Sequence, residues 1–334
     1  MNRTFSRCVK KCKSVLSTQL FVYATVITLV TLIPGVYVTG GKVFSKERPM
    51  NLGDYLAARH AQYIDDADAA VRFYRSNLLS NPNNFNIQNQ IFTILVFQGK
   101  VKESLALAEK LIKSEKNNIS LPLLVLALRD IRGGNYAKAV KKLDLLPTNG
   151  IHSFSVPVIK AWSLAAKQNF GDALNNLEQR MKNPGFIALY APHAGLIAEV
   201  AGKSEISKKH FKDALKQYRR ISANMTRLAG EFYERNNMSL KAKALYLNYS
   251  KFNANSSLFN HALERLAANN PKKFRKTSPQ TGIAEALFGL SRSIQRQDPY
   301  QAIIWIQLAI FVDPDFSFAR LRLADALSSE NILQ

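Results

Sequence analysis

The five histidines of this sequence could act as general acids or bases or as metal ligands, and they are scattered along the chain. No two of them stand four residues apart with a glutamate between them, the spacing that lets one helix face hold zinc in a metalloprotease. No glycine-rich loop ends in Gly-Lys-Ser or Gly-Lys-Thr to hold phosphates. We therefore expect no catalytic residues, no metal and no cofactor. The histidines are His60, His152, His193, His210 and His261.

Three carboxylates lie close together in the sequence, at Asp65, Asp66 and Asp68. Carboxylate oxygens are hard ligands, so the group is a candidate cation site. The same residues directly precede Ala69, and an aspartate there could end a turn and cap the first turn of a helix. The residues fit both interpretations, and we favour the turn with a capping aspartate.

The 334-residue chain is strongly basic, with 46 lysines and arginines against 24 acidic residues and a formal net charge of +22. Such a field attracts acidic partners, whether nucleic acid, anionic lipid or acidic protein, and does not choose among them. Both cysteines, Cys8 and Cys12, lie in the basic N-terminal tail. The rest of the chain therefore has neither a disulfide framework nor a cysteine metal site.

Residues 14–40 contain no charged side chain. An apolar stretch of this length can cross a hydrocarbon core of about 30 Å as a helix. Residues 1–13 carry more excess positive charge than the short segment beyond, so we expect a cytoplasmic tail, a single-pass anchor in the bacterial inner membrane and a periplasmic body from about residue 42. The alternative is a secreted domain, released by signal cleavage near Gly40.

A pattern of residue sizes recurs every 34 or 35 residues in six consecutive units. Each unit has two mostly small residues twelve positions apart and a mostly large residue four positions later. Two short helices with their turns fit this length; small residues let the helices cross closely, and large ones fill the groove beside them. The first small series is Ala58, Phe92, Ala127, Ala161, Gly195 and Gly230; the second is Ala70, Ser104, Ala139, Ala173, Ser207 and Ala242; the large series is Tyr74, Ala108, Leu143, Leu177, Phe211 and Tyr246.

With this unit the chain resembles the tetratricopeptide repeat family, whose 34-residue helix–turn–helix motif has the same pattern of small and large residues. The resemblance covers about residues 51–256 as six units and reappears in DPYQAIIWIQLAIFVDPDF. The interval from Ala242 to Ala302 is 60 residues, which breaks the period. More loosely, TGIAEALFGL followed by that last unit is similar to membrane-attached tetratricopeptide proteins of alphaproteobacteria.

The resemblance implies an all-α fold, a superhelical solenoid of tetratricopeptide-like helix pairs preceded by one transmembrane helix. Beyond the six units we expect an irregular unit and basic linker at 257–282, then a further repeat plus a terminal helix at 283–334. The linker contains a proline and a run of basic residues, both typical of a solvated connection.

In this family the first helix of each pair lines the inner face, which commonly holds an extended or helical peptide. The inward positions that the resemblance implies form an apolar strip in the middle units, flanked by polar ends. The alternative is that the tryptophan and leucines of this strip pack between adjacent first helices. The candidate binding residues are Arg59, Asn89, Leu124, Leu128, Trp162 and Leu196.

We therefore expect a non-enzymatic, membrane-tethered scaffold of the cell envelope that binds a protein or peptide segment on its inner face. The alternative is a protein that binds a polyanion or nucleic acid through its basic surface, with affinity that falls steeply with salt. The expected placement of the body outside the cytoplasm argues against nucleic acid.

Overall fold

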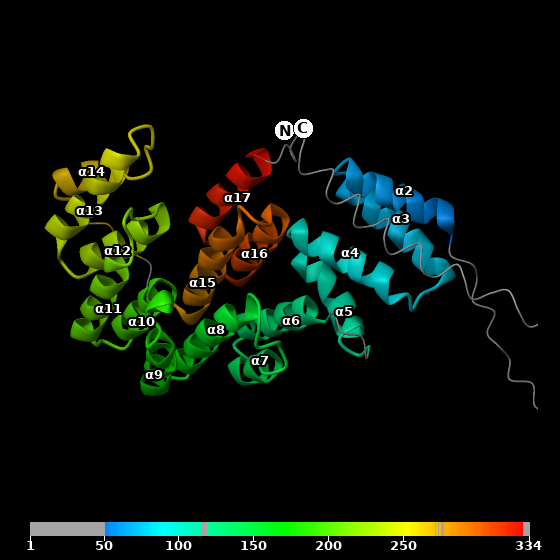
Figure 1. Ribbon diagram of the computed structural model, residues 1–334, viewed down its shortest axis with the longest axis horizontal. Helices are drawn as coiled ribbons and strands as arrows, with labels where there is room; N and C mark the ends of the chain where they lie inside the picture. The colour runs from blue at the N-terminus through cyan, green and yellow to red at the C-terminus, as the bar shows by residue number, and fades with distance from the viewer. Residues whose placement is uncertain (1–50, 115–118, 271, 273, 275–276, 330–334) are drawn as a thin grey trace, which may run out of the picture. The chain divides into compact units, whose positions relative to one another are not determined.

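The computed structural model describes residues 51–114, 119–270, 272, 274 and 277–329. The regular structure of these residues is entirely helical, with 16 α-helices and one short 3₁₀ helix (Figure 1). The expected tail at 1–13 and anchor at 14–40 lie outside the described residues. Within the part that is described, no helix combines the length and apolar character that a membrane crossing requires.

Six helix pairs follow one another along the chain, and from α2 to α11 each helix contacts the next. Contacts between sequence neighbours are the basis of a solenoid. The pairs are α2 (Leu52–Tyr63) with α3 (Ala67–Ser80), α4 (Phe85–Phe97) with α5 (Val101–Leu111), α6 (Ser120–Arg132) with α7 (Tyr136–Leu143), α8 (His152–Ala166) with α9 (Phe170–Met181), α10 (Ile187–Val200) with α11 (Ser204–Lys216), and α12 (Ala223–Arg235) with α13 (Ser239–Phe252). The 3₁₀ helix η1 (Pro184–Phe186) leads into α10.

The turn inside each pair contains one residue in the left-handed backbone region, with φ between 58° and 75°. These residues are spaced 34 or 35 positions apart, the same period as the small residues. Glycine adopts this conformation at no steric cost, and asparagine and aspartate tolerate it, so the turn chemistry repeats at five of the six positions; Gln168 is the exception. The six residues are Asp65, Gly99, Gly134, Gln168, Gly202 and Asn237.

The small residues lie where the two helices of a pair cross. All six members of the second small series are completely buried. A Cβ added to Gly230 would stand 2.3 Å from the ring of Tyr246, and one added to Gly195 would stand 2.8 Å from Phe211. The Ser207 hydroxyl donates to the Gly195 carbonyl at 2.7 Å, which satisfies the buried hydroxyl at this crossing. The size pattern is therefore a packing rule: a small residue on the first helix makes room for a large one on the second.

The second unit obeys this rule with the sizes exchanged. Phe92 stands at the small position and Ala108 stands sixteen residues later at the large one, and both are completely buried. The total side-chain volume at the crossing is thereby kept, which is the kind of change that a packed core tolerates best. The departure of Phe92 from the sequence pattern is thus compensated within its own pair.

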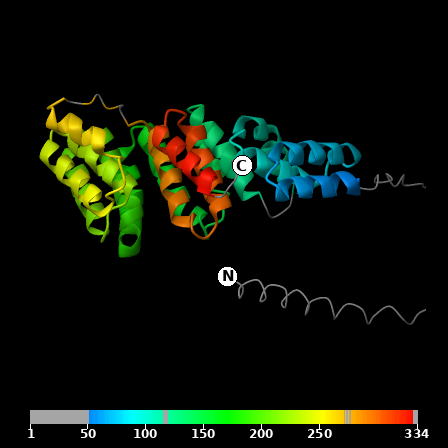
Figure 2. The same cartoon turned by 90° about the horizontal axis from the view of Figure 1, so that it is seen from above.

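The last helices leave the stacking order of the six pairs. They are α14 (Asn260–Ala267), which contacts α13, followed by α15 (Pro279–Ile294), α16 (Pro299–Val312) and α17 (Ser317–Ser329). Helices α15 and α16 contact each other and also pack against α8, α4, α6 and α10, far back in the sequence (Figure 1). Figure 2 shows the same association at right angles, with the orange helices beside green and teal ones.

Candidate functional site

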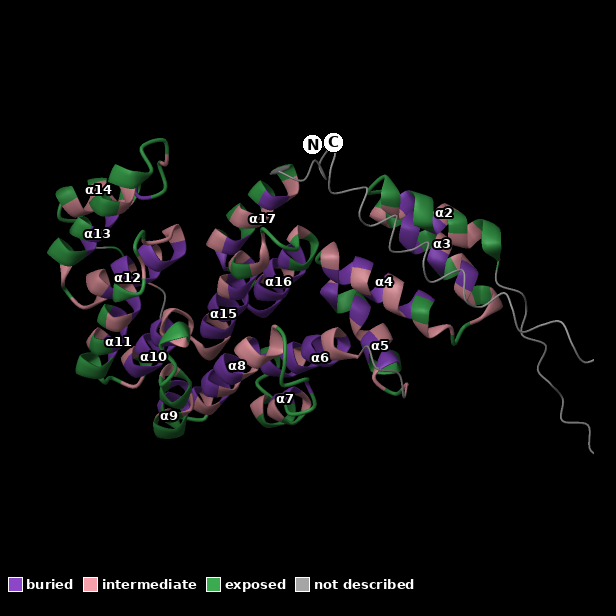
Figure 3. Ribbon diagram, viewed as in Figure 1, coloured by how far each residue is buried: buried purple, intermediate pink, exposed green. Residues whose placement is uncertain are grey.

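The first helices of the middle pairs, α4, α6, α8 and α10, meet α15 and α16 rather than open solvent. Residues of α6, α8, α15 and α16 are mostly buried, whereas α2 and α14 are largely exposed (Figure 3). At the centre of this contact, Gly282 of α15 lies against the indole of Trp162 of α8. A Cβ on residue 282 would come within 2.0 Å of that ring, so only glycine allows this approach.

Trp162 is completely buried, and its Nε1 donates to Nδ1 of His193 on α10 at 3.4 Å. Burial lowers the pKa of His193 to about 4. The imidazole is therefore neutral at physiological pH and can accept the indole hydrogen bond. This pair is therefore a polar contact inside the core, in which Trp162 is completely buried and His193 is 4% exposed.

The apolar strip expected on the inner face is not open in this structure. Leu124, Leu128 and Trp162 have no exposed surface and Leu196 is 2% exposed, because helices α15 and α16 cover the faces of the first helices. The alternative expectation is that these side chains pack between adjacent first helices; they are buried, and Trp162 also packs against Gly282 of α15. The two polar candidates do not join them: Arg59 on α2 is exposed and Asn89 on α4 is half-buried.

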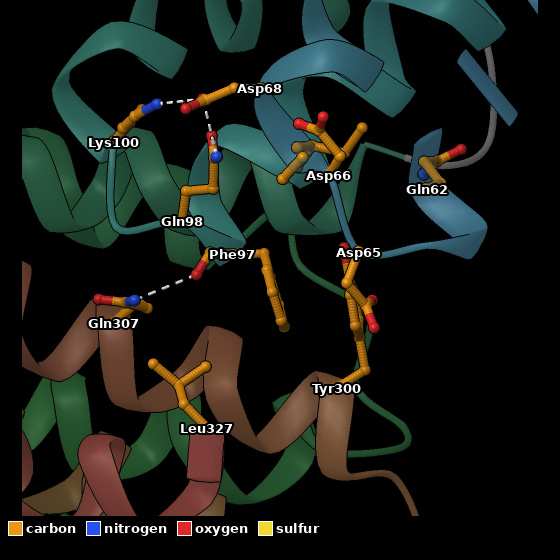
Figure 4. A pocket seen from close by; sticks show the side chains of 12 residues that line it. Gln62, Asp65, Asp66, Asp68, Phe97, Gln98, Lys100, Tyr300, Gln307 and Leu327 are labelled. Atoms are coloured by element: carbon orange, nitrogen blue, oxygen red, sulfur yellow. Dashed lines mark hydrogen bonds and ion pairs between the residues drawn. The ribbon is translucent and has the colours of Figure 1, made fainter. Parts of the chain in front are cut away.

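An open pocket of about 480 Å³ lies where α16 meets the first two pairs (Figure 4). Its rim is the α2–α3 turn and the end of α4, and Gln307 of α16 fixes one side by donating to the Phe97 carbonyl at 3.1 Å. The rings of Phe97 and Tyr300 stack with centroids 4.2 Å apart. The remaining lining includes Gln62, Asp65, Asp66, Asp68, Gln98, Lys100 and Leu327. We call this space the aromatic–acidic pocket.

The three carboxylates at the pocket rim have different structural roles. Asp66 caps α3 by accepting from the backbone N–H of Ala69 at 2.9 Å, as the turn interpretation predicts. Asp65 forms the left-handed turn with φ of 59°, and Asp68 pairs with Lys100 at 2.6 Å. Among the residues that the structure describes, no three histidine, cysteine, aspartate or glutamate side chains are grouped to hold a metal ion.

The electrostatics of the aromatic–acidic pocket favour a cation. Neither Asp65 nor Asp66 forms an ion pair within the described chain. Burial, and then the charge of Asp65, raises the pKa of Tyr300 to about 12. The phenol therefore keeps its proton, and the stacked aromatic faces beside two carboxylates form a surface on which an ammonium or guanidinium group is stabilised.

The histidines are distributed over separate helices and do not assemble with other groups into a reactive site. His60 and His261 are exposed, and His261 reaches only Glu264 on its own helix. Burial lowers the pKa of His152 and of His210, the latter 3.3 Å from Glu178. None of the hydrogen bonds or ion pairs of these histidines within the described chain involves a serine, threonine or cysteine.

The turn residue and the two small residues of each helix pair recur every 34 or 35 positions. The small residues lie where the two helices of a pair cross. The described chain is an all-helical solenoid of successive helix pairs. No family model matches the sequence. No curated protein matches it either.

Solved structures offer distant similarities to this solenoid. A tetratricopeptide repeat protein from Parabacteroides merdae matches with a TM-score of 0.49 and 12% identity, covering 83% of this chain and 98% of that one. The MamA protein matches with a TM-score of 0.42 and 18% identity over 50% and 90% of the two chains. The tetratricopeptide domain of P58(IPK) matches with a TM-score of 0.25 and 15% identity, covering 84% of this chain and 79% of that one. Because these scores are below 0.5, the helix pairs themselves establish the fold.

Sequence reasoning did not find the stacked rings of Phe97 and Tyr300. They lie 203 positions apart and meet only because α16 packs back onto α4. One signal in the sequence pointed this way. The 60-residue interval between Ala242 and Ala302 shows that α16 cannot continue the stack in register.

Proposed function

We propose that this chain is a non-enzymatic scaffold that binds a segment of another protein, and that the segment binds in the aromatic–acidic pocket. The observation that carries the proposal is the placement of the Phe97–Tyr300 stack beside Asp65 and Asp66 at the open edge of the inner face. An extended segment could place a lysine or arginine there, with its aliphatic stem against the rings and its charge near the carboxylates.

The central strip of Leu124, Leu128, Trp162 and Leu196 takes part in binding only if α15 and α16 leave the inner face. These side chains now form core contacts, and exposing them would return their apolar surface to water. Replacing Trp162 consequently tests folding rather than binding. A useful binding test has to change the aromatic–acidic pocket, whose charged residues are accessible.

The test uses two substitutions that keep local structure. Asparagine tolerates the left-handed turn at residue 65 and also caps helices well, so Asp65→Asn with Asp66→Asn removes two charges and preserves both turn and cap. The matched control is Glu103→Gln with Glu205→Gln, which removes two exposed charges elsewhere. Affinity capture from detergent-solubilised membranes, followed by mass spectrometry, compares the three proteins.

We expect the pocket variant to lose its partner, with affinity reduced roughly thirtyfold, because two partly desolvated ion pairs are removed and each contributes on the order of 1 kcal/mol. The control variant should retain the partner. Equal recovery by both variants would place binding outside the pocket. Failure of the unaltered protein to recover any partner reproducibly would contradict the scaffold itself.

We also propose that residues 14–40 tether this scaffold to the bacterial inner membrane, with the solenoid in the periplasm. The supporting feature is the uncharged stretch behind a basic tail. A reporter fused after Gln334 should be active in the periplasm and remain with the membrane fraction. Periplasmic activity in the soluble fraction would indicate cleavage near Gly40, and cytoplasmic activity would restore nucleic acid as a partner class.

A further inference from the structure

A second cavity, of about 490 Å³, lies between the α11–α12 turn, α13, α15 and α17. Five arginines line it, and no aspartate or glutamate does. Arg219 and Arg220 come from the α11–α12 turn, Arg292 from α15, Arg296 from the turn that follows, and Arg322 from α17. We call this space the arginine cavity. It is separate from the aromatic–acidic pocket, with which it shares no lining residue.

Most of the positive charge in the arginine cavity is not neutralised by the chain. Arg322 pairs with Asp325 at 3.0 Å, and Arg220 lies over the Phe252 ring at 5.6 Å. The other three arginines form no ion pair with any residue that the structure describes. Burial, and then the charge of Arg322, lowers the pKa of Arg292, as expected for a half-buried cation without an acidic partner.

The polar groups around the arginines also favour an anion in the cavity. Helix α12 begins at the cavity wall, where Ser222 and Ala223 are lining residues, so the positive end of its dipole faces the space. Asn248 and Tyr249 of α13 also line it and supply an amide and a phenol as hydrogen-bond donors. Phe252 and Phe318 complete the wall with apolar surface.

Like charges that converge repel one another, and the repulsion is greatest at the half-buried Arg292 and Arg322, where water screens it least. A counter-charge in the cavity would relieve it. Each guanidinium presents a fork of N–H donors that matches the oxygens of a phosphate group, and several forks aimed at one space suit a group with several anionic oxygens. We propose that the arginine cavity binds a compact multivalent anion of the phosphate or pyrophosphate class. The cavity also has room for an organic substituent of that anion against Phe252 and Phe318.

The experiment measures thermal unfolding of the detergent-solubilised full chain with added sodium pyrophosphate, at constant ionic strength set with sodium chloride. The proposal predicts a rise in Tm of about 2–5 °C near saturation. The double variant Arg292→Gln with Arg296→Gln should lose this rise. It should also bind pyrophosphate at least about tenfold more weakly by calorimetry, since two charge-assisted contacts are removed.

The matched control is Lys209→Gln with Lys212→Gln, which removes the same charge from the exposed face of α11. It should keep the pyrophosphate response. A second readout is the single variant Arg292→Gln without pyrophosphate: removing an unpaired half-buried cation should leave Tm unchanged or raise it. A merely structural role for Arg292 predicts a fall in Tm, and that fall would contradict the proposal.

Two probes separate a soluble ligand from a lipid headgroup. Sodium pyrophosphate represents soluble anions, and phosphatidylcholine vesicles containing phosphatidic acid represent a membrane phosphomonoester. The proposal is supported if the response to one of these probes is lost in the Arg292→Gln and Arg296→Gln variant and kept in the lysine variant. The probe that gives the response then shows whether the anion is soluble or a lipid headgroup. Equal loss in both double variants would show general charge attraction and overturn the proposal. So would the absence of a response to both probes.

Discussion

The indole of Trp162 and the backbone of Gly282 are in direct contact, although 120 residues separate them in the sequence. This contact attaches α15 to the inner side of the first helices, and it exists because residue 282 has no side chain. The same contact therefore contributes to the stability of the core and holds α15 over the inner face.

Gly282→Ala should destabilise the protein by about 1–3 kcal/mol, because the added methyl group would overlap the buried indole. The matched control lies on the same helix. Gly289 has no atom within 4 Å of an added Cβ, so Gly289→Ala should stabilise α15 by roughly 0.5–1 kcal/mol through backbone entropy. Urea unfolding midpoints measure both changes. Equal midpoints for the two variants would show that Trp162 does not depend on close approach at residue 282.

The exchanged sizes at Phe92 and Ala108 predict strong coupling between these two positions. Phe92→Ala alone should cost about 3–5 kcal/mol by leaving a cavity, and Ala108→Leu alone should cost about 1–3 kcal/mol by overpacking. The double variant restores the usual small–large order and should cost less than the sum by about 1 kcal/mol or more. Simple additivity, as expected for Phe92→Ala combined with the distant Leu177→Ala, would refute the compensation.

Arg227 of α12 and Glu285 of α15 form a second attachment, with Nη2 2.5 Å from Oε1 and 2.6 Å from Oε2. Both side chains are largely buried, at 14% and 4% exposure. Glu285→Leu alone leaves Arg227 with the neutral Asn224 amide oxygen at 2.9 Å and the more distant Glu231 carboxylate at 3.4 Å, and should cost about 3 kcal/mol. Adding Arg227→Met removes the stranded charge and should recover most of that loss. A double variant as unstable as the single one would contradict this account.

Because the pKa of His193 is lowered in the folded protein, we expect the stability of the protein to fall as the pH falls. Above the ordinary histidine pKa near 6.5 the side chain is neutral in both states, so the folded protein suffers no penalty. As pH falls toward about 4, the unfolded chain gains a proton that the buried imidazole does not, and stability is lost by up to roughly 3 kcal/mol. His193→Gln should flatten this part of the curve measured by chemical unfolding. A parallel curve for the variant would show that other groups cause the loss.

Local information determined much of this architecture in advance. Small residues at Ala139 and Ala173, and turn residues such as Gly134 and Gly202, specify helix pairs because each acts on its immediate neighbours in the chain. The capping role of Asp66 could be predicted for the same reason, since it involves a backbone N–H three residues away.

The tertiary structure alone decided which surfaces are open. A repeat period encodes contacts between successive helices, and it carries no information on where a pair outside the period will dock. The placement of α15 and α16 therefore could not be derived from the sequence, and with it neither the burial of Trp162 nor the stacking of Phe97 on Tyr300. The five arginines of the arginine cavity span 104 positions and share no spacing. Only the fold of the whole chain brings their charges to one place.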